Sequence, residues 1–187
     1  MSFIPILAVV IRAVWSLCEA VRLRREKKSE AETYDRHSSM LWDVAIGLEL
    51  IGIVFGFTAI GRIQSGRGTL MIIGPVLLIF GIAIRWAAIF KLGRYFTGKV
   101  LIRKDHQLIR TGLYKYVRHP AYAGSLIAHV GLGLSLGNWV SLGCSFIPFC
   151  VAAFYRMHVE DEALNKKFGQ EYLDYSITAK RLIPKLY

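Results

Sequence analysis

Five long apolar segments, separated by basic connections, limit what this chain can fold into more than any other feature of its sequence. The segments cover about residues 3–21, 41–61, 69–90, 122–136 and 139–156. A helix that crosses a bilayer needs about 20 mostly apolar residues, and lipid offers no partner to backbone groups that a helix leaves unpaired. The sequence therefore predicts an all-α integral membrane protein with five transmembrane helices. Only Gly137 and Asn138 separate the last two, so we expect these to form a tight helical hairpin.

The composition agrees with one membrane domain over residues 1–187. Of the 187 residues, 54% are hydrophobic and 20% are charged, and the mean hydropathy is +0.41. Five spans of about 20 residues would use more than half of the chain. The first segment lacks a basic start and a small-residue cleavage site, so we interpret it as a spanning helix and not as a signal peptide. Three cysteines exclude a disulfide framework.

The distribution of Lys and Arg predicts how the helices are oriented. Although the net charge is +11, the basic residues lie between apolar segments, which favours anionic membrane lipids over nucleic acid as partners. Five crossings would put twenty Lys and Arg residues on one side, in residues 22–39, 91–121 and 156–187, against Arg62 and Arg67 on the other. The positive-inside rule then predicts a multi-pass protein with its amino terminus outside and its carboxyl terminus in the cytoplasm. Residues 22–39 are expected to form a charged, helical or irregular connection.

Arg12, Glu49 and Arg85 are charged residues that fall inside the predicted helices. Arg12 and Glu49 lie at depths that differ by only about 4–5 Å at 1.5 Å per residue, so we expect them to form a structural ion pair. Arg85 lies five residues from the predicted cytoplasmic end of its segment, and we expect its side chain to reach the membrane surface instead.

Polar residues gather in two stretches on the predicted cytoplasmic side, residues 99–122 and residues 156–187. The predicted hairpin joins these stretches, so we expect them to form a site together. Arg156 and Glu160 are four residues apart and would share one face of a helix. The pair has two interpretations: an ion pair that ends the helix, or a site in which Arg156 binds a carboxylate and Glu160 a cationic ligand.

The residues around Pro120 suggest how the first stretch contributes. Pro120 suits the first turn of a helix, which puts His119 at the helix amino terminus, where free N–H groups attract anions. Tyr114 and Tyr122 offer rings that could stack on an adenine, although each could also be an ordinary interfacial residue. No G-x-G-x-x-G motif follows a strand, and the five histidines lack H-x-x-x-H spacing, so neither a soluble dinucleotide fold nor a metal site is expected.

The residues of both stretches resemble the isoprenylcysteine carboxyl methyltransferase family. The positions that carry the resemblance are Gly112, Tyr114, Arg118, His119, Pro120, Tyr122 and Gly124, then Arg156, Glu160, Glu162, Leu164, Phe168, Gly169, Tyr172 and Tyr175, and finally Arg181 and Pro184. They lie in roughly the last 85 residues, within the region 99–187. Part of the pattern is shared with other membrane methyltransferases, including phospholipid methyltransferases.

The resemblance implies S-adenosylmethionine as the cofactor. It also implies methyl transfer, at the cytoplasmic membrane face, to the carboxylate of a prenylated cysteine or a similar lipid-linked carboxylate. The implied cofactor-binding residues are His106, Gln107, Leu108, Ile109, Tyr114, His119, Pro120, Ala121, Tyr122 and Glu160. Arg156 is implied to bind the acceptor carboxylate, which makes Arg156 and Glu160 the catalytic pair.

Three other functions stay open at this point. They are a phospholipid N-methyltransferase, an NADPH-dependent sterol-type reductase with similar carboxyl-terminal motifs, and a membrane scaffold without catalytic activity. Arg156 favours a carboxylate acceptor over an amine, because an amine acceptor has no use for a positive charge beside it.

Overall fold

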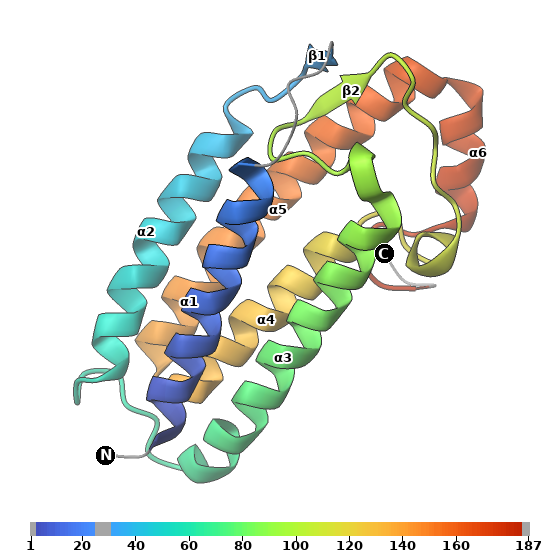
Figure 1. Cartoon of the computed structure of the whole chain (residues 1–187). Helices are drawn as coiled ribbons and strands as arrows, with labels where there is room; N and C mark the ends of the chain where they lie inside the picture. The colour runs from blue at the N-terminus through green and yellow to red at the C-terminus, as the bar shows by residue number, and fades with distance from the viewer. Residues whose placement is uncertain (1–2, 25–30, 185–187) are drawn as a thin grey trace.

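Five helices lie side by side in the computed structural model of the chain, which describes residues 3–24 and 31–184 (Figure 1). They are α1 (Phe3–Arg24), α2 (Ser38–Gly56), α3 (Arg67–Leu92), α4 (Pro120–Leu136) and α5 (Trp139–Phe168). Shorter elements are the 3-10 helices η1 (Gly93–Tyr95) and η2 (Gly112–Lys115), the strands β1 (Ala31–Thr33) and β2 (Leu101–Arg103), and α6 (Gln170–Thr178). The helical membrane architecture predicted from the sequence is confirmed.

Four helices are long and apolar enough to cross a membrane: α1, α2, α5, and α3 together with η1. α4 is apolar but has 17 residues, which is the lower limit for a crossing. It lies between α3 and α5, packed against both (Figure 1). Among the described residues four helices therefore meet both criteria, and the fifth crossing stays a prediction.

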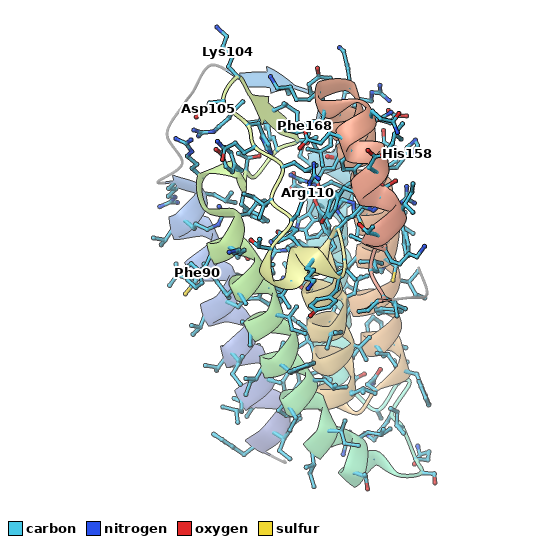
Figure 2. The ribbon with its side chains drawn as sticks, turned by 90° about the vertical axis from the view of Figure 1, so that its right-hand side faces the viewer. Phe90, Lys104, Asp105, Arg110, His158 and Phe168 are labelled. Atoms are coloured by element: carbon cyan, nitrogen blue, oxygen red, sulfur yellow. The ribbon has the colours of Figure 1, made fainter. Side chains whose placement is uncertain are left out.

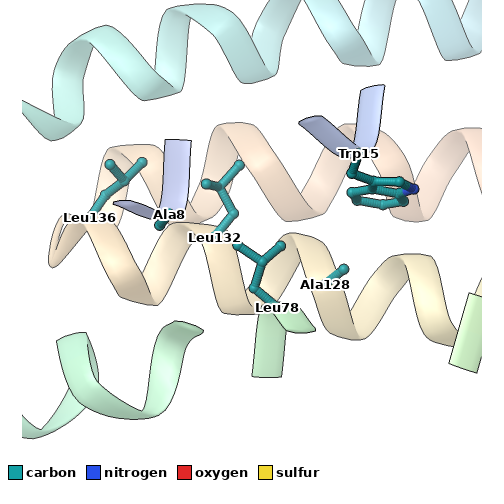
Figure 3. Packing of buried hydrophobic residues seen from close by; sticks show 6 residues of the cluster. All are labelled: Ala8, Trp15, Leu78, Ala128, Leu132 and Leu136. Atoms are coloured by element: carbon teal, nitrogen blue, oxygen red, sulfur yellow. The ribbon is translucent and has the colours of Figure 1, made fainter. Parts of the chain in front are cut away.

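A cluster of buried apolar side chains joins α1, α3 and α4 (Figure 3). Its members are Ala8, Trp15, Leu78, Ala128, Leu132 and Leu136. α3 and α4 approach closely at this level, and a Cβ added to Gly131 would lie 2.3 Å from the backbone nitrogen of Leu78. Small residues at such contacts let membrane helices pack where the hydrophobic effect does not drive association. This contact fixes the position of α4, and with it the residues at the start of α4, relative to α3.

The predicted hairpin between the last two apolar segments is confirmed. Gly137 takes a left-handed conformation with φ 60°, and the Asn138 side chain accepts hydrogen bonds from N–H groups in the first turn of α5. The Asn138 amide also donates to the carbonyl of Ile60 at 2.7 Å, so it holds the α2–α3 turn as well. α2 ends at Gly56, before this turn, whereas the sequence predicted that the helix would continue to residue 61.

The largest boundary correction concerns α5, which ends at Phe168 instead of near residue 156. The extension is helical because Val159 and Ala163 are buried against the β2 segment, which gives a mostly polar sequence one apolar face. Arg156 and Glu160 therefore lie inside α5, so their ion pair is present but does not end the helix. The first, third and fourth predicted segments differ from α1, α3 and α4 by at most three residues at either end.

The strands β1 and β2 pair antiparallel, with Glu32 opposite Ile102. The N–H of Tyr34 extends this ladder by donating to the carbonyl of Val100 at 2.8 Å. The connection over residues 22–39 thus contains a strand that its charge pattern did not predict. Four of the basic residues assigned to the cytoplasmic side lie outside the described residues: Arg25, Lys27, Lys28 and Lys185.

Arg12, Glu49 and Arg85 are all paired inside the bundle. The predicted pair of Arg12 and Glu49 is confirmed, with 2.6 Å between Nη2 and Oε2 and 3.1 Å between Nε and Oε1. The prediction for Arg85 is wrong, because its Nε donates to Oε1 of Glu19 at 2.6 Å and its Nη1 to the hydroxyl of Ser125 at 2.8 Å. Glu19 on α1 supplies the opposite charge that lets Arg85 stay inside the bundle.

Candidate functional site

The connection between α3 and α4 folds over one end of the bundle and encloses a cavity, which we call the loop cavity. Lys104 and Asp105 mark the tip of this connection (Figure 2). The lining residues come from parts of residues 92–102, from residues 106–109, from Tyr114, Arg118, His119, Ala121 and Tyr122, and from Glu160, Leu164, Tyr172 and Tyr175. Stretches far apart in the sequence thus converge at one end of the molecule.

Nine of the ten residues implied as cofactor-binding line the loop cavity. They are His106, Gln107, Leu108, Ile109, Tyr114, His119, Ala121, Tyr122 and Glu160. The tenth, Pro120, is buried at the first position of α4 and is not among the lining residues, so its contact with a cofactor stays a prediction. Its role is to start the helix that His119 precedes.

Glu160 lies at the centre of the polar contacts around the loop cavity. The hydroxyl of Tyr122 donates to Oε1 of Glu160 at 2.5 Å, and Nδ1 of His119 lies 3.5 Å from Oε2. Nε of Arg156 lies 3.6 Å from Oε1, so the two residues share a helix face as their spacing predicted. The Glu160 side chain remains 27% exposed, which leaves part of the carboxylate available to a ligand in the cavity.

A second carboxylate, Asp161, holds His119 from the other side. Nε2 of His119 lies 2.7 Å from Oδ1 of Asp161, and Nε of Arg181 donates to Oδ2 at 2.8 Å. Burial alone would lower the pKa of the buried His119 imidazole, but the hydrogen bonds and negative charges of Asp161 and Glu160 raise it above its ordinary value. The two carboxylates thus favour the imidazolium form of His119. The sequence reasoning missed Asp161, although it directly follows Glu160.

Aromatic side chains form the rest of the wall. Burial raises the pKa of Tyr114, and it raises the pKa of Tyr175 to about 12, so both rings are neutral at physiological pH. The hydroxyl of Tyr175 donates to the carbonyl of Tyr114 at 2.6 Å, which joins α6 to η2. His106 stacks on Tyr95 with 4.8 Å between ring centroids, and burial lowers its pKa. These walls suit a flat, uncharged heteroaromatic group.

Arg156 faces a second cavity, which we call the bundle cavity. This cavity has a volume of about 310 Å³ and lies between α1 and α2, with residues of α3, α4 and α5 as its floor. Arg156 is 7% exposed, and its Nη2 donates to the carbonyl of Gly98 at 2.6 Å. Tyr122, Phe96 and Thr97 line both cavities and so form the wall between them. Arg156 and Glu160 thus lie close together but line different cavities.

Within the described residues, no group of three or more His, Cys, Asp or Glu side chains is arranged to hold a metal ion. The fold and site define an α-helical membrane protein with a polar, aromatic-walled cavity at one end of its bundle and a second cavity among the helices.

The chain belongs to the isoprenylcysteine carboxyl methyltransferase family, whose sequence profile matches residues 72–166. The chain is 36% identical over 117 residues to protein-S-isoprenylcysteine O-methyltransferase A of Arabidopsis thaliana, which covers 59% of this chain and 57% of that protein. It is 33% identical over 144 residues to an uncharacterised protein of Haemophilus influenzae, which covers 73% of this chain and 78% of that protein.

A solved structure of a eukaryotic intramembrane Ras methyltransferase, an isoprenylcysteine carboxyl methyltransferase, has a similar fold. It matches with a TM-score of 0.59 and 26% sequence identity, over 79% of this chain and 52% of that one. The chain spans about half the length of the Arabidopsis enzyme and of this solved structure.

Proposed function

We propose that this chain transfers a methyl group from S-adenosylmethionine to the carboxylate of a prenylated cysteine or a similar lipid-linked carboxylate. The observation that carries the proposal is that Glu160 and Arg156 lie close together but border different cavities, with Tyr122 lining both. Glu160 borders a polar, aromatic-walled cavity, and Arg156 borders a cavity among the membrane helices. A cationic donor and an anionic lipid acceptor need this combination of charges on two sides of one wall.

The residues of the loop cavity fit S-adenosylmethionine. Arg118 Nε and His106 Nδ1 are buried there without a hydrogen-bond partner among the described residues, and Arg118 could bind a carboxylate. Glu160 offers a carboxylate to a cation, and Tyr114 offers a neutral ring to an adenine. When bound, the cofactor would supply a methyl group activated by a positively charged sulfur.

Little acid–base chemistry is required of the chain itself. A carboxylate has an ordinary pKa near 4, so the acceptor is ionised at neutral pH and no residue has to act as a general base. The task of the site is then alignment and the exclusion of water. Arg156 orients the acceptor carboxylate through a planar, two-pronged contact, and its buried Nε has no hydrogen-bond partner among the described residues. Glu160 holds the donor.

The experiment that tests the function supplies purified protein with methyl-labelled S-adenosylmethionine and one of two acceptors. N-acetyl-S-farnesylcysteine should be methylated at its carboxylate, and phosphatidylethanolamine should not be methylated. Transfer only to the amine lipid would favour the phospholipid N-methyltransferase. Failure with both acceptors, together with no binding of the donor, would leave the sterol-type reductase or the scaffold, which NADPH binding separates.

We further propose five crossings, with the loop cavity at the cytoplasmic face. The charge bias of the connections supports this orientation, as does α4, whose course follows the neighbouring helices (Figure 1). The test uses a chain in which the three native cysteines are replaced and a single new cysteine is introduced, as Ser65→Cys or as Lys167→Cys. Both residues are exposed. An impermeant thiol reagent should label them from opposite sides of the membrane, and labelling of both from one side would contradict five crossings.

A further inference from the structure

The inner end of the bundle cavity contains polar groups, although it lies midway along α1, α2 and α4. His129 lines it and is 1% exposed, and Arg12 lines it while paired with Glu49. Ionisable side chains at this depth are costly, and they generally mark a function when a protein retains them.

The hydrogen bonds around His129 determine which ring nitrogen carries its proton. Nδ1 lies 2.6 Å from the carbonyl oxygen of Ser125, so Nδ1 is protonated and donates. Nε2 then presents a lone pair. Oε1 of Glu49 lies 3.4 Å from Nε2, but it is also an acceptor and already accepts from Nε of Arg12. Among the described residues, no donor is hydrogen-bonded to Nε2. A buried acceptor left in this state destabilises the fold unless a water molecule or a ligand donates to it.

The imidazole ring of His129 is also held in place. Its centroid lies 3.6 Å from that of Phe149 on α5 and 5.5 Å from that of Trp15 on α1. These contacts from two sides, together with the Nδ1 hydrogen bond, fix the ring. These contacts hold Nε2 in place, and the bundle cavity, which His129 lines, is the side from which a donor would approach it.

We propose that His129 accepts a hydrogen bond from the lipid acceptor, and that this acceptor carries a hydroxyl group about 10 Å from its carboxylate. Tyr122 and His129 are seven residues apart on α4, as are Phe149 and Arg156 on α5, which gives about 10 Å between the two ends of the cavity at 1.5 Å per residue. A plain prenyl chain has only hydrocarbon at this distance and would leave Nε2 unpaired. The inference rests on the proposed function for the carboxylate end, where Arg156 lies.

The test measures binding of two lipids that differ only in the hydroxyl. Stearate and 10-hydroxystearate have the same chain and carboxylate, and the hydroxyl lies near the middle of the chain. Trp15 and Trp42 line the bundle cavity, so quenching of tryptophan fluorescence reports its occupation without any methyl transfer. We expect the full-length protein in detergent to bind 10-hydroxystearate about three- to tenfold more tightly than stearate, the range expected for one hydrogen bond.

Variants at His129 connect this preference to the proposed contact. His129→Phe should abolish the preference, so that this variant binds the two lipids with equal affinity. His129→Gln, whose side-chain carbonyl can accept, should retain part of the preference. His158→Phe is the matched control, because the side chain of His158 is 59% exposed and lies on the outer side of α5 (Figure 2), so this variant should keep the full preference.

Equal binding of the two lipids by the wild type would overturn the proposal. This is the result expected if Nε2 carries a second proton and donates to Glu49. Unchanged preference in His129→Phe would overturn it as well. If that variant does not fold, 3-hydroxystearate serves as a further probe for the wild type, since its hydroxyl lies beside the carboxylate and should give no gain. If the protein prefers the hydroxylated lipid but transfers no methyl group, the proposed function is refuted and the hydroxyl site is supported. If it transfers methyl groups but binds both lipids equally, the proposed function is supported and the hydroxyl site is refuted.

Discussion

The loop cavity and the bundle cavity share a wall but are assembled in different ways. Around the loop cavity, the charged side chains come from short stretches of the carboxyl-terminal half, and Glu160 and Asp161 are adjacent in sequence. In the bundle cavity, the charged residues come from α1, α2, α3 and α5, and pairs form between helices, as with Arg85 of α3 and Glu19 of α1. The first arrangement can be recognised as a motif, whereas the second exists only once the helices are packed.

The largest effect is expected from Arg156→Ala, which tests whether the two cavities divide the substrates between them. Removing the charge beside the acceptor should reduce methyl transfer by about a hundredfold, while donor binding measured by calorimetry stays near the wild-type value. Arg156→Lys should rescue little, because an ammonium lacks the planar two-pronged geometry. Equal loss of donor binding and of transfer would show that the cavities do not act separately.

Glu160→Gln should have the complementary effect. Losing a hydrogen bond to a charged group costs about 1.5–3 kcal/mol, so affinity for S-adenosylmethionine should fall roughly ten- to a hundredfold. Glu162→Gln is the matched control, because Glu162 lies two residues further along α5, has a 43% exposed side chain and pairs with Arg36 outside the cavities. If Glu160→Gln binds S-adenosylmethionine with wild-type affinity, Glu160 does not bind the donor and is only a structural partner of Arg156.

Charge pairs in the bundle cavity should contribute to stability. Arg12→Leu and Glu49→Leu should each lower the free energy of unfolding by about 1–2 kcal/mol, given the modest strength of polar contacts between membrane helices. The double variant should be more stable than the worse single one, because no unpaired charge is left inside the bundle. Unfolding in mixed detergent measures this. A double variant no better than the worse single one would refute the pairing.

The smallest effect is expected from pH acting on His119. Asp161 and Glu160 raise the pKa of His119 in the folded state above its ordinary value of about 6.5. The stabilisation that follows from this shift is complete below about pH 6.5 and is lost as the pH rises through the pKa of His119 in the folded protein. The stability difference between the wild type and His119→Gln should therefore shrink above neutral pH. His158→Gln, at an exposed position, should show no such trend, and a pH-independent difference would contradict the imidazolium assignment.

The parts of the fold that depend on local pattern were predictable. Apolar length located all five bundle helices, and the Gly137-Asn138 turn predicted the hairpin. The end of α5 was not predictable, since its polar last turns are helical only because Val159 and Ala163 pack against β2. Pairing of β1 with β2 joins distant residues and left no local signal.

The same distinction applies to the site residues. His106 and Tyr114 could be expected in the loop cavity because the family resemblance implies both as cofactor-binding residues. The prediction for Arg85 was wrong because depth along a helix gives no information about which partner faces a side chain across the bundle. That partner is Glu19 of α1. Asp161 was missed because its role depends on Tyr172 and Arg181, which reach it from α6 and the chain beyond.

The β1–β2 ladder has a consequence for the order in which the molecule assembles. It joins residues 31–33 to residues 101–103 through only three residue pairs, across a stretch of chain that includes all of α2 and α3. Closing so long a loop costs conformational entropy that three pairs do not offset by themselves, so the ladder can form only after α2 and α3 have packed. The cover of the loop cavity should therefore be the last part to fold and the first to open in denaturant, while the helix bundle beneath it is still intact.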